Sequence, residues 1–354
     1  MTASKKSFCL ILGVVLILCS CLVVNAEETQ PLKSGDFSYE IYDDGTLCLT
    51  EYHGEGGDVI IPEAIDGKAV SVLGDELFWY MEEVTSVTLP ESLEYIGARV
   101  FQHCTALTSI KIPDSVLEIG DACFEGCSKL TDINISANLV YVGAFAFDAT
   151  PWVTQFDGCS SIILGGRIFY KYLSDEDMVV IPDGVVCLSD NAFESKKLSF
   201  VSIPETVAFI GDFCFYNCKN LKEICLGKGI YHIGENSIGL LQGVNEVEAV
   251  EDFTIYADEG SLGADYAKKY NVNLKATADF KVPENLPQPE VCEPTAEIRD
   301  VQPQAKPAGL SQGGVVAVVL SIAGCVVIVG GIAAGSYIYE KKRKLNNKNS
   351  KKKK

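Results

Sequence analysis

Histidine, tryptophan and basic residues are scarce in this 354-residue sequence, which has three His, two Trp and 29 Lys+Arg against 48 Asp+Glu. So few histidines, at His53, His103 and His232, leave little material for a His-based catalytic triad or metal site. The basic residues are also gathered at the two ends. Residues 27–312 carry 18 Lys+Arg and 47 Asp+Glu, a net charge of 18 − 47 = −29. Such an acidic body disfavours nucleic acid and anionic surfaces as partners.

The N-terminus has the pattern of an export signal over residues 1–26. Two lysines precede an apolar run at residues 8–18, which is too short for an ordinary membrane-spanning helix. Small residues precede the predicted cleavage point after Ala26. An alternative takes residues 18–21 as a lipobox, with Cys21 as the lipidated residue.

The C-terminal part predicts a membrane anchor. No charge occurs between Lys306 and Glu340, so residues 313–339 are predicted to form one transmembrane helix. The nine Lys+Arg of residues 340–354 place this tail in the cytoplasm, because positive charge stays inside. Residues 276–312 hold six of the 13 prolines and have no apolar period, which predicts a disordered stalk. The expected location is the plasma membrane, single-pass, with the ectodomain at the cell surface.

An internal repeat of 23 residues dominates the ectodomain. Glycine recurs at Gly74, Gly97, Gly120 and Gly143, and phenylalanine at Phe78, Phe101, Phe124 and Phe147. Later units, which include Phe193 and Phe215, bring the total to about seven coils, four before a break and three after. No coil can bury its apolar residues alone, but stacked coils align them into one core. Proline is predicted to end a strand in four coils, at Pro90, Pro113, Pro182 and Pro204. The repeated glycine is predicted at a position hostile to Cβ, with a positive φ.

The pattern LxxIxIPxxVxxIGxxAFxxC resembles the BspA-like leucine-rich repeat over about residues 36–275. The resemblance implies a mainly β solenoid of about seven 22–23-residue coils with capping elements. The C-terminal transmembrane helix is added to this fold. The expected cap hairpin turns at residues 43–45, and Ser261 is the expected N-cap of a helix in the C-terminal cap. The predicted ectodomain parts are an N-terminal hairpin cap (27–58), array 1 (59–150), a hairpin insertion (151–178), array 2 (179–246), a C-terminal cap (247–275) and the stalk (276–312).

The cysteines are predicted to be mostly free and buried, because several of them recur at core positions of the repeat. Export favours disulfides instead, and the sequence leaves this tension open. The pairs Cys123/Cys127 and Cys214/Cys218 look like zinc half-sites, but three coils and the insertion separate them. With strand spacing of about 4.8 Å, His103 and His232 lie on the order of 25 Å apart. No catalytic residue, metal or cofactor is therefore expected.

A partner-binding or adhesion module is the favoured function, as the resemblance also implies. The expected partner is an extracellular protein, a glycan, or a host or microbial surface. The alternatives are a structural envelope protein or, less favoured, the outer part of a membrane-bound enzyme or sensor. The candidate contact residues are the insertion aromatics and two apolar residues expected to be exposed on array 2: Trp152, Phe156, Tyr170, Tyr172, Val180 and Phe200. The alternative for the aromatics is that they pack the hairpin onto the array.

Overall fold

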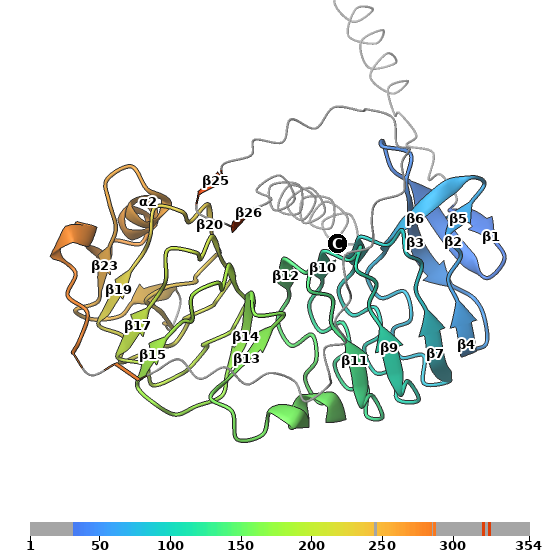
Figure 1. Ribbon diagram of the computed structural model, residues 1–354, viewed down its shortest axis with the longest axis horizontal. Coiled ribbons are helices and arrows are strands. Elements are labelled where there is room, and N and C mark those ends of the chain that lie inside the picture. The colour runs from blue at the N-terminus through green and yellow to red at the C-terminus, as the bar shows by residue number, and fades with distance from the viewer. Residues whose placement is uncertain (1–30, 244–245, 285, 288–320, 323–324, 327–354) are drawn as a thin grey trace, which may run out of the picture.

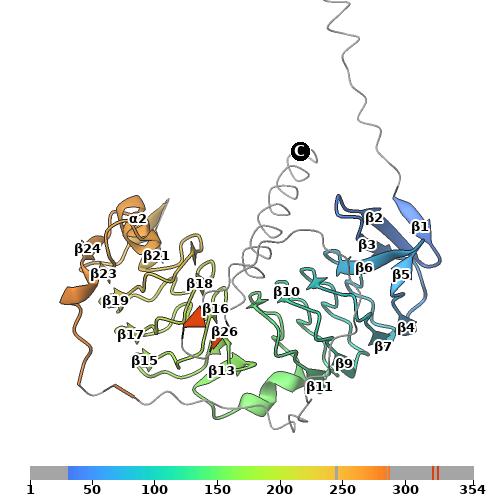
Figure 2. The ribbon, with the colours of Figure 1, turned by 45° about the horizontal axis from the view of Figure 1, so that its top comes forward.

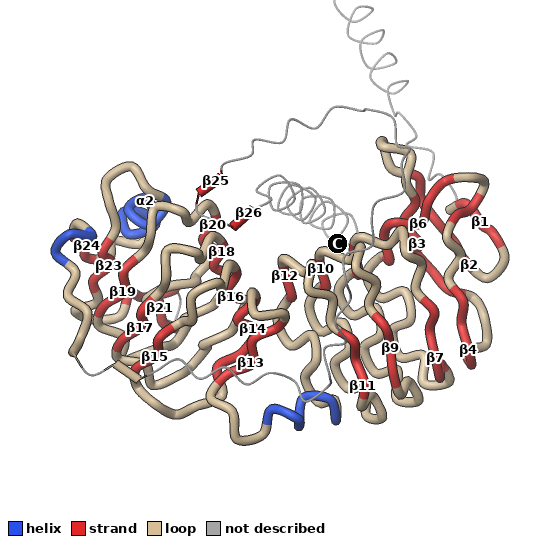
Figure 3. The backbone as a smooth tube through the Cα atoms, viewed as in Figure 1, coloured by secondary structure: helices blue, strands red, loops and turns tan. Residues whose placement is uncertain are grey.

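The computed structural model describes residues 31–243, 246–284, 286–287, 321–322 and 325–326. From residue 31 to residue 284 the chain winds into a mainly β solenoid of about ten turns. Its coils lie side by side along an arc (Figures 1 and 2). Figure 3 shows that short strands alternate with long connections and that helix is confined to a few segments.

Each complete coil contributes one strand to each of two parallel rows. The first strand row consists of β4 (Gly57–Ile60), β7 (Val84–Thr88), β9 (Ser109–Lys111), β11 (Asp132–Asn134), β15 (Met178–Val180), β17 (Phe200–Ser202) and β19 (Glu223–Cys225). The second strand row consists of β6 (Lys68–Leu73), β8 (Tyr95–Ile96), β10 (Glu118–Ile119), β12 (Tyr141–Val142), β16 (Cys187–Leu188), β18 (Phe209–Ile210) and β20 (His232–Ile233). Seven coils carry both strands. The caps and the insertion supply the remaining turns.

Additional elements close the ends of the solenoid and interrupt its middle. At the N-terminus, β1 (Leu32–Ser34), β2 (Phe37–Ile41) and β3 (Leu47–Tyr52) are antiparallel, β3 pairs with β6, and β5 (Ala64–Ile65) also joins β6. Between the arrays lie the 3-10 helix η1 (Pro151–Phe156) and the hairpin of β13 (Ser161–Leu164) and β14 (Ile168–Tyr172). The C-terminal elements are β21 (Leu240–Gln242), β22 (Val247–Ala249), β23 (Thr254–Tyr256), α2 (Leu262–Lys269) and β24 (Asn273–Lys275). Ser261 caps α2 by accepting a hydrogen bond from Ala264 N.

A ladder of stacked phenylalanine rings forms the centre of the core. The six repeated residues Phe78, Phe101, Phe124, Phe147, Phe193 and Phe215 are all 0% exposed. In array 1 the ring of Phe124 stacks on that of Phe101 at 5.2 Å and on that of Phe147 at 5.7 Å. Trp152 then packs against Phe147, at 4.8 Å between ring centroids. The insertion therefore continues the core of array 1.

The repeated cysteines of the described coils are free thiols with a structural role. The thiol of Cys127 donates a hydrogen bond to the carbonyl oxygen of Phe101 at 3.0 Å, and Cys104 and Cys218 contact the preceding coil's phenylalanine in the same way. Burial raises the pKa of the Cys104 and Cys218 thiols to about 12. Because the thiolate is the nucleophile and the metal ligand, these thiols are inert at neutral pH.

The repeated glycines are required by close coil contact, and the expectation of a positive φ is wrong. Gly74, Gly97, Gly120, Gly143, Gly211 and Gly234 all lie outside the positive-φ region. A Cβ added to any of them would come within 2.2–2.7 Å of an atom of the neighbouring coil. In the coil turns, the positive-φ positions are mostly held by non-glycine residues, for example Tyr80 at 58° and His103 at 61°.

The segment after β24 returns along the first strand row of array 2. The 3-10 helix η2 (Thr277–Asp279) is held by Thr277, whose hydroxyl donates to Asp258 at 2.5 Å. The ring of Phe280 then stacks on that of Phe200 at 5.7 Å and meets that of Tyr256 at 5.0 Å. The predicted stalk boundary at residue 276 is therefore too early, because the chain is still packed on the solenoid at residue 280. We call residues 276–284 the return segment.

The predicted signal peptide and cytoplasmic tail lie outside the described residues. Within the predicted membrane helix at 313–339, the structure describes only the antiparallel pair β25 (Ser321–Ile322) and β26 (Cys325–Val326). These four residues are not helical, contrary to the prediction. Nowhere in the described part of the chain is a helix both long and apolar enough to span a bilayer.

Cys159, in the insertion, differs from the repeat cysteines because it forms a disulfide bond. The other eight cysteines whose side chains are described are free, so none of them is its partner. By sequence position, Cys9, Cys19 and Cys21 fall in the predicted signal and Cys325 in the predicted membrane segment, which leaves Cys292.

We expect peptide mapping without reductant to recover Cys159 joined to Cys292. Pro287 lines the same cavity as Cys159, and the five residues from Pro287 to Cys292 can span at most about 18 Å. The matched control is Cys225, which is half-buried and should be recovered as a free thiol. Recovery of Cys159 and Cys292 on separate, alkylated peptides would contradict the pairing.

Candidate functional site

The aromatic residues predicted to contact a partner are buried. Trp152, Phe156, Tyr170 and Tyr172 are 1–4% exposed, because they pack the insertion against the neighbouring coils. Tyr170 shows the reason: its ring meets that of Phe147 at 5.5 Å, and its hydroxyl accepts a hydrogen bond from Phe147 N at 3.1 Å. In this structure these side chains are part of the core.

The two apolar residues expected to be exposed on array 2 are also largely covered. Phe200 is 6% exposed, since the return segment lays Phe280 over it. Val180 is half-buried. In the strand row, Met178 pairs with Phe200 and Val180 pairs with Ser202. The first strand row of array 2 is therefore not the open apolar surface that the sequence suggested.

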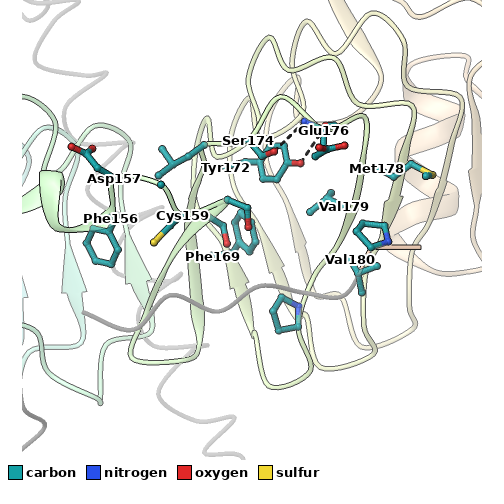
Figure 4. A pocket seen from close by; sticks show the side chains of 16 residues that line it. Phe156, Asp157, Cys159, Phe169, Tyr172, Ser174, Glu176, Met178, Val179 and Val180 are labelled. Carbon is teal, nitrogen blue, oxygen red and sulfur yellow. Dashed lines mark hydrogen bonds between the residues drawn. The ribbon is translucent and has the colours of Figure 1, made fainter. Parts of the chain in front are cut away.

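Three of the predicted contact residues meet at one cavity beside the insertion. Phe156, Tyr172 and Val180 line a cavity of about 590 Å³, together with Cys159 and Pro287. Figure 4 shows Phe156 and Cys159 on one side and Tyr172 and Val180 on the other. The Tyr172 hydroxyl donates to the carbonyl oxygen of Glu176 at 3.2 Å. Trp152 and Tyr170 do not line this cavity.

The sequence-based reasoning missed an exposed aromatic pair in array 1. Trp79 and Tyr80 follow the ladder residue Phe78 and are 47% and 53% exposed. Their ring centroids lie 4.9 Å apart in an edge-to-face arrangement. Gln102 and His103 hold the same positions in the next coil and contact them. We call these four residues the turn patch. The signal was available, because most aligned coils place polar or small residues where Trp79 and Tyr80 stand. The exception, Tyr216 at the Trp79 position of array 2, is buried.

The three histidines lie apart from one another in the part of the chain that the structure describes. His53 contacts Ser38 in the N-terminal cap at 2.7 Å, His103 packs against the ring of Tyr80, and His232 stacks on Phe209 in array 2. Over the residues that the structure describes, no group of three or more His, Cys, Asp or Glu could hold a metal ion.

One buried carboxylate lies at the junction of the two arrays. Asp190 is 8% exposed, and its two oxygens accept hydrogen bonds from Tyr141 Oη and Asp212 N, each at 2.7 Å. Burial, with the nearby carboxylates of Asp121 and Asp212, raises the pKa of Asp190 to about 8. Such a shift is common at active sites. Here both oxygens are engaged in holding coils together, which is a structural role.

Asp190 should make the protein less stable as pH rises. Its pKa is near 3.9 when unfolded and about 8 when folded, so folding favours the protonated form. The contribution of Asp190 to the unfolding free energy is fully present below about pH 4 and is lost between about pH 4 and pH 8. We expect Asp190→Asn to flatten the decline of the unfolding free energy between pH 5 and pH 8 in urea titrations. The exposed Asp175→Asn is the control, and parallel slopes for Asp190→Asn and wild type would contradict the prediction.

Comparison with known proteins gives one matching family and several similar solved structures. The family described as BspA type leucine-rich repeat region matches in six copies, over residues 61–174 and 162–258. A solved leucine-rich repeat protein from Bacteroides ovatus is 20% identical, with a TM-score of 0.35 and coverage of 69% of this chain and 66% of that chain. One from T. pallidum is 21% identical, with a TM-score of 0.30 and coverage of 70% and 98%. A leucine rich cell surface protein from Faecalibacterium prausnitzii is 15% identical, with a TM-score of 0.26 and coverage of 70% and 95%. None of the curated proteins matches the chain.

Proposed function

Because the chain belongs to the BspA-type leucine-rich repeat family, whose members are generally surface or adhesion-type proteins, we propose that it is a cell-surface binding module. It binds an extracellular protein, a glycan, or a host or microbial surface. It performs no catalysis itself, as is typical of this family of binding scaffolds. The uncharged, apolar stretch of residues 313–339 anchors it in the membrane, with the basic residues 340–354 in the cytoplasm.

The observation that carries this proposal is how the described solenoid uses its large side chains. The ladder and insertion aromatics are buried in two hydrophobic clusters, one running through array 1 and one through array 2. Trp79 and Tyr80 stand outside both clusters, in array 1. Aromatic side chains are the usual anchors of protein interfaces. The disulfide of Cys159 is further support, because disulfides persist in oxidising, extracytoplasmic compartments.

The test is a binding experiment with the full chain in a mild detergent. Immobilised matrix proteins, glycans and intact cells would be incubated with increasing protein, and bound protein would be measured. We expect saturable binding to at least one of these surfaces, weakened by Trp79→Ala. Tyr231→Ala is the control, since Tyr231 is a partly exposed aromatic on array 2. A flat response on every surface, from folded protein, would contradict the proposed function.

A further inference from the structure

We propose that the turn patch binds a basic peptide segment of the partner, taking Arg or Lys side chains between the Trp79 and Tyr80 rings and the carboxylates beside them. This inference rests on the proposed function, because it names the class of partner and the surface that receives it.

The two rings are held in place before any partner arrives. Trp79 Nε1 donates a hydrogen bond to Gln102 Oε1 at 2.8 Å, and the Tyr80 ring lies 4.4 Å from the ring of His103. Gln102 is fixed in turn by its bond to Glu125 in the third coil. Since the next coils already order these side chains, little conformational entropy is lost when a ligand binds them.

Folding does not explain why these two residues are aromatic. Tyr80 adopts a φ of 58°, and the equivalent turn positions hold smaller or polar residues at a similar φ: His103, Gly126, Ala149, Ser195 and Asn217. A bulky non-glycine residue held there costs on the order of 1 kcal/mol. Both rings are about half exposed, so about half of each aromatic surface stays in water when no partner is bound. Binding of a partner explains this exposed aromatic pair better than folding does.

The surrounding charge selects a cationic partner. Asp75, Glu76, Glu82 and Glu83 flank the two aromatics and are exposed. The nearby cation, Arg99, is already paired with Glu76 at 2.7 Å. Array 1 as a whole, residues 59–150, has 14 acidic and four basic residues. A guanidinium or ammonium group over an indole or phenol face gains a cation–π attraction, which the neighbouring carboxylates reinforce.

The patch carries its own spectroscopic reporter. The chain has two tryptophans, and Trp152 is 4% exposed, so acrylamide quenching of fluorescence reports mainly on Trp79. The probe is a synthetic decapeptide of alternating arginine and glycine, with a glutamate-glycine peptide as its counterpart. We expect the arginine peptide to protect Trp79 saturably in the full chain, and the protection to weaken with salt. The glutamate peptide should give no protection.

Substitutions distinguish binding at the turn patch from general attraction to the acidic solenoid. Tyr80→Asn keeps a residue that tolerates the positive φ, and Glu82→Gln with Glu83→Gln removes two charges. Each change should weaken peptide binding about tenfold. The control, Glu251→Gln with Glu259→Gln, removes two charges at the far end of the solenoid and should change binding less than about twofold.

Three outcomes would overturn the inference. One is equal weakening by the control pair, and another is protection of Trp79 by a neutral hexasaccharide but not by the arginine peptide. The third is binding of the full chain to a natural surface that Trp79→Ala leaves unchanged, which would leave the proposed function standing. A flat response on all natural surfaces counts against the proposed function instead, whatever the peptide does.

Discussion

Replacing Phe124 with alanine is expected to lower the free energy of unfolding by about 3–5 kcal/mol. Phe124 is 0% exposed, and its ring stacks on a phenylalanine on either side. Removing it leaves a cavity between two coils that cannot close without shifting the whole stack. Urea unfolding followed by circular dichroism measures the loss.

The control is Phe145→Ala in the next coil. Phe145 is 44% exposed, so its removal should change the unfolding free energy by less than about 1 kcal/mol. Equal effects of the two substitutions would show that the stacked rings do not form the core.

Replacing Gly120 with alanine is the second large effect, and we expect a loss of about 2–3 kcal/mol. The new Cβ would lie 2.5 Å from Ala98 N and 2.7 Å from Gly97 C, both backbone atoms that no side-chain rotation can move away. The neighbouring coil would have to shift. The same urea titration measures the loss.

Gly227→Ala is the matched control, because its Cβ would find its nearest atom 3.8 Å away and its φ is not positive. Alanine at such a site is expected to be neutral or stabilising by up to about 1 kcal/mol. The steric explanation fails if Gly120→Ala is tolerated as well as Gly227→Ala.

The fold was predictable from the sequence because its main determinant is periodic. A residue that recurs every 23 positions, such as Phe101 or Gly97, has to occupy the same place in each coil. That argument also located the break between the arrays. It did not give the reason for the glycine. A close approach between coils and a positive φ both disfavour a Cβ, and spacing alone does not distinguish them.

The candidate site was harder to predict because it depends on single residues outside the period. Phe280 has no repeat partners, so nothing in the sequence showed that the return segment covers Phe200. The sequence leaves Phe156 and Tyr172 as either surface anchors or packing residues, because interfaces and cores are both rich in aromatics, and the structure shows that they pack. Trp79, in contrast, is easily read as a core residue although it is exposed. It follows a core phenylalanine, and only an alignment of the coils shows that its position is normally polar.

Surface presentation is the central requirement, since no extracellular partner is reachable without it. We would treat intact cells that make this protein with a membrane-impermeant amine-reactive biotin and map the labelled lysines. Lys111, whose side chain is 76% exposed, is expected to be labelled on intact cells. The tail lysines Lys351–Lys354 should be labelled only after the cells are permeabilised. Labelling of the tail on intact cells, or protection of Lys111 until permeabilisation, would contradict a surface-displayed binding module.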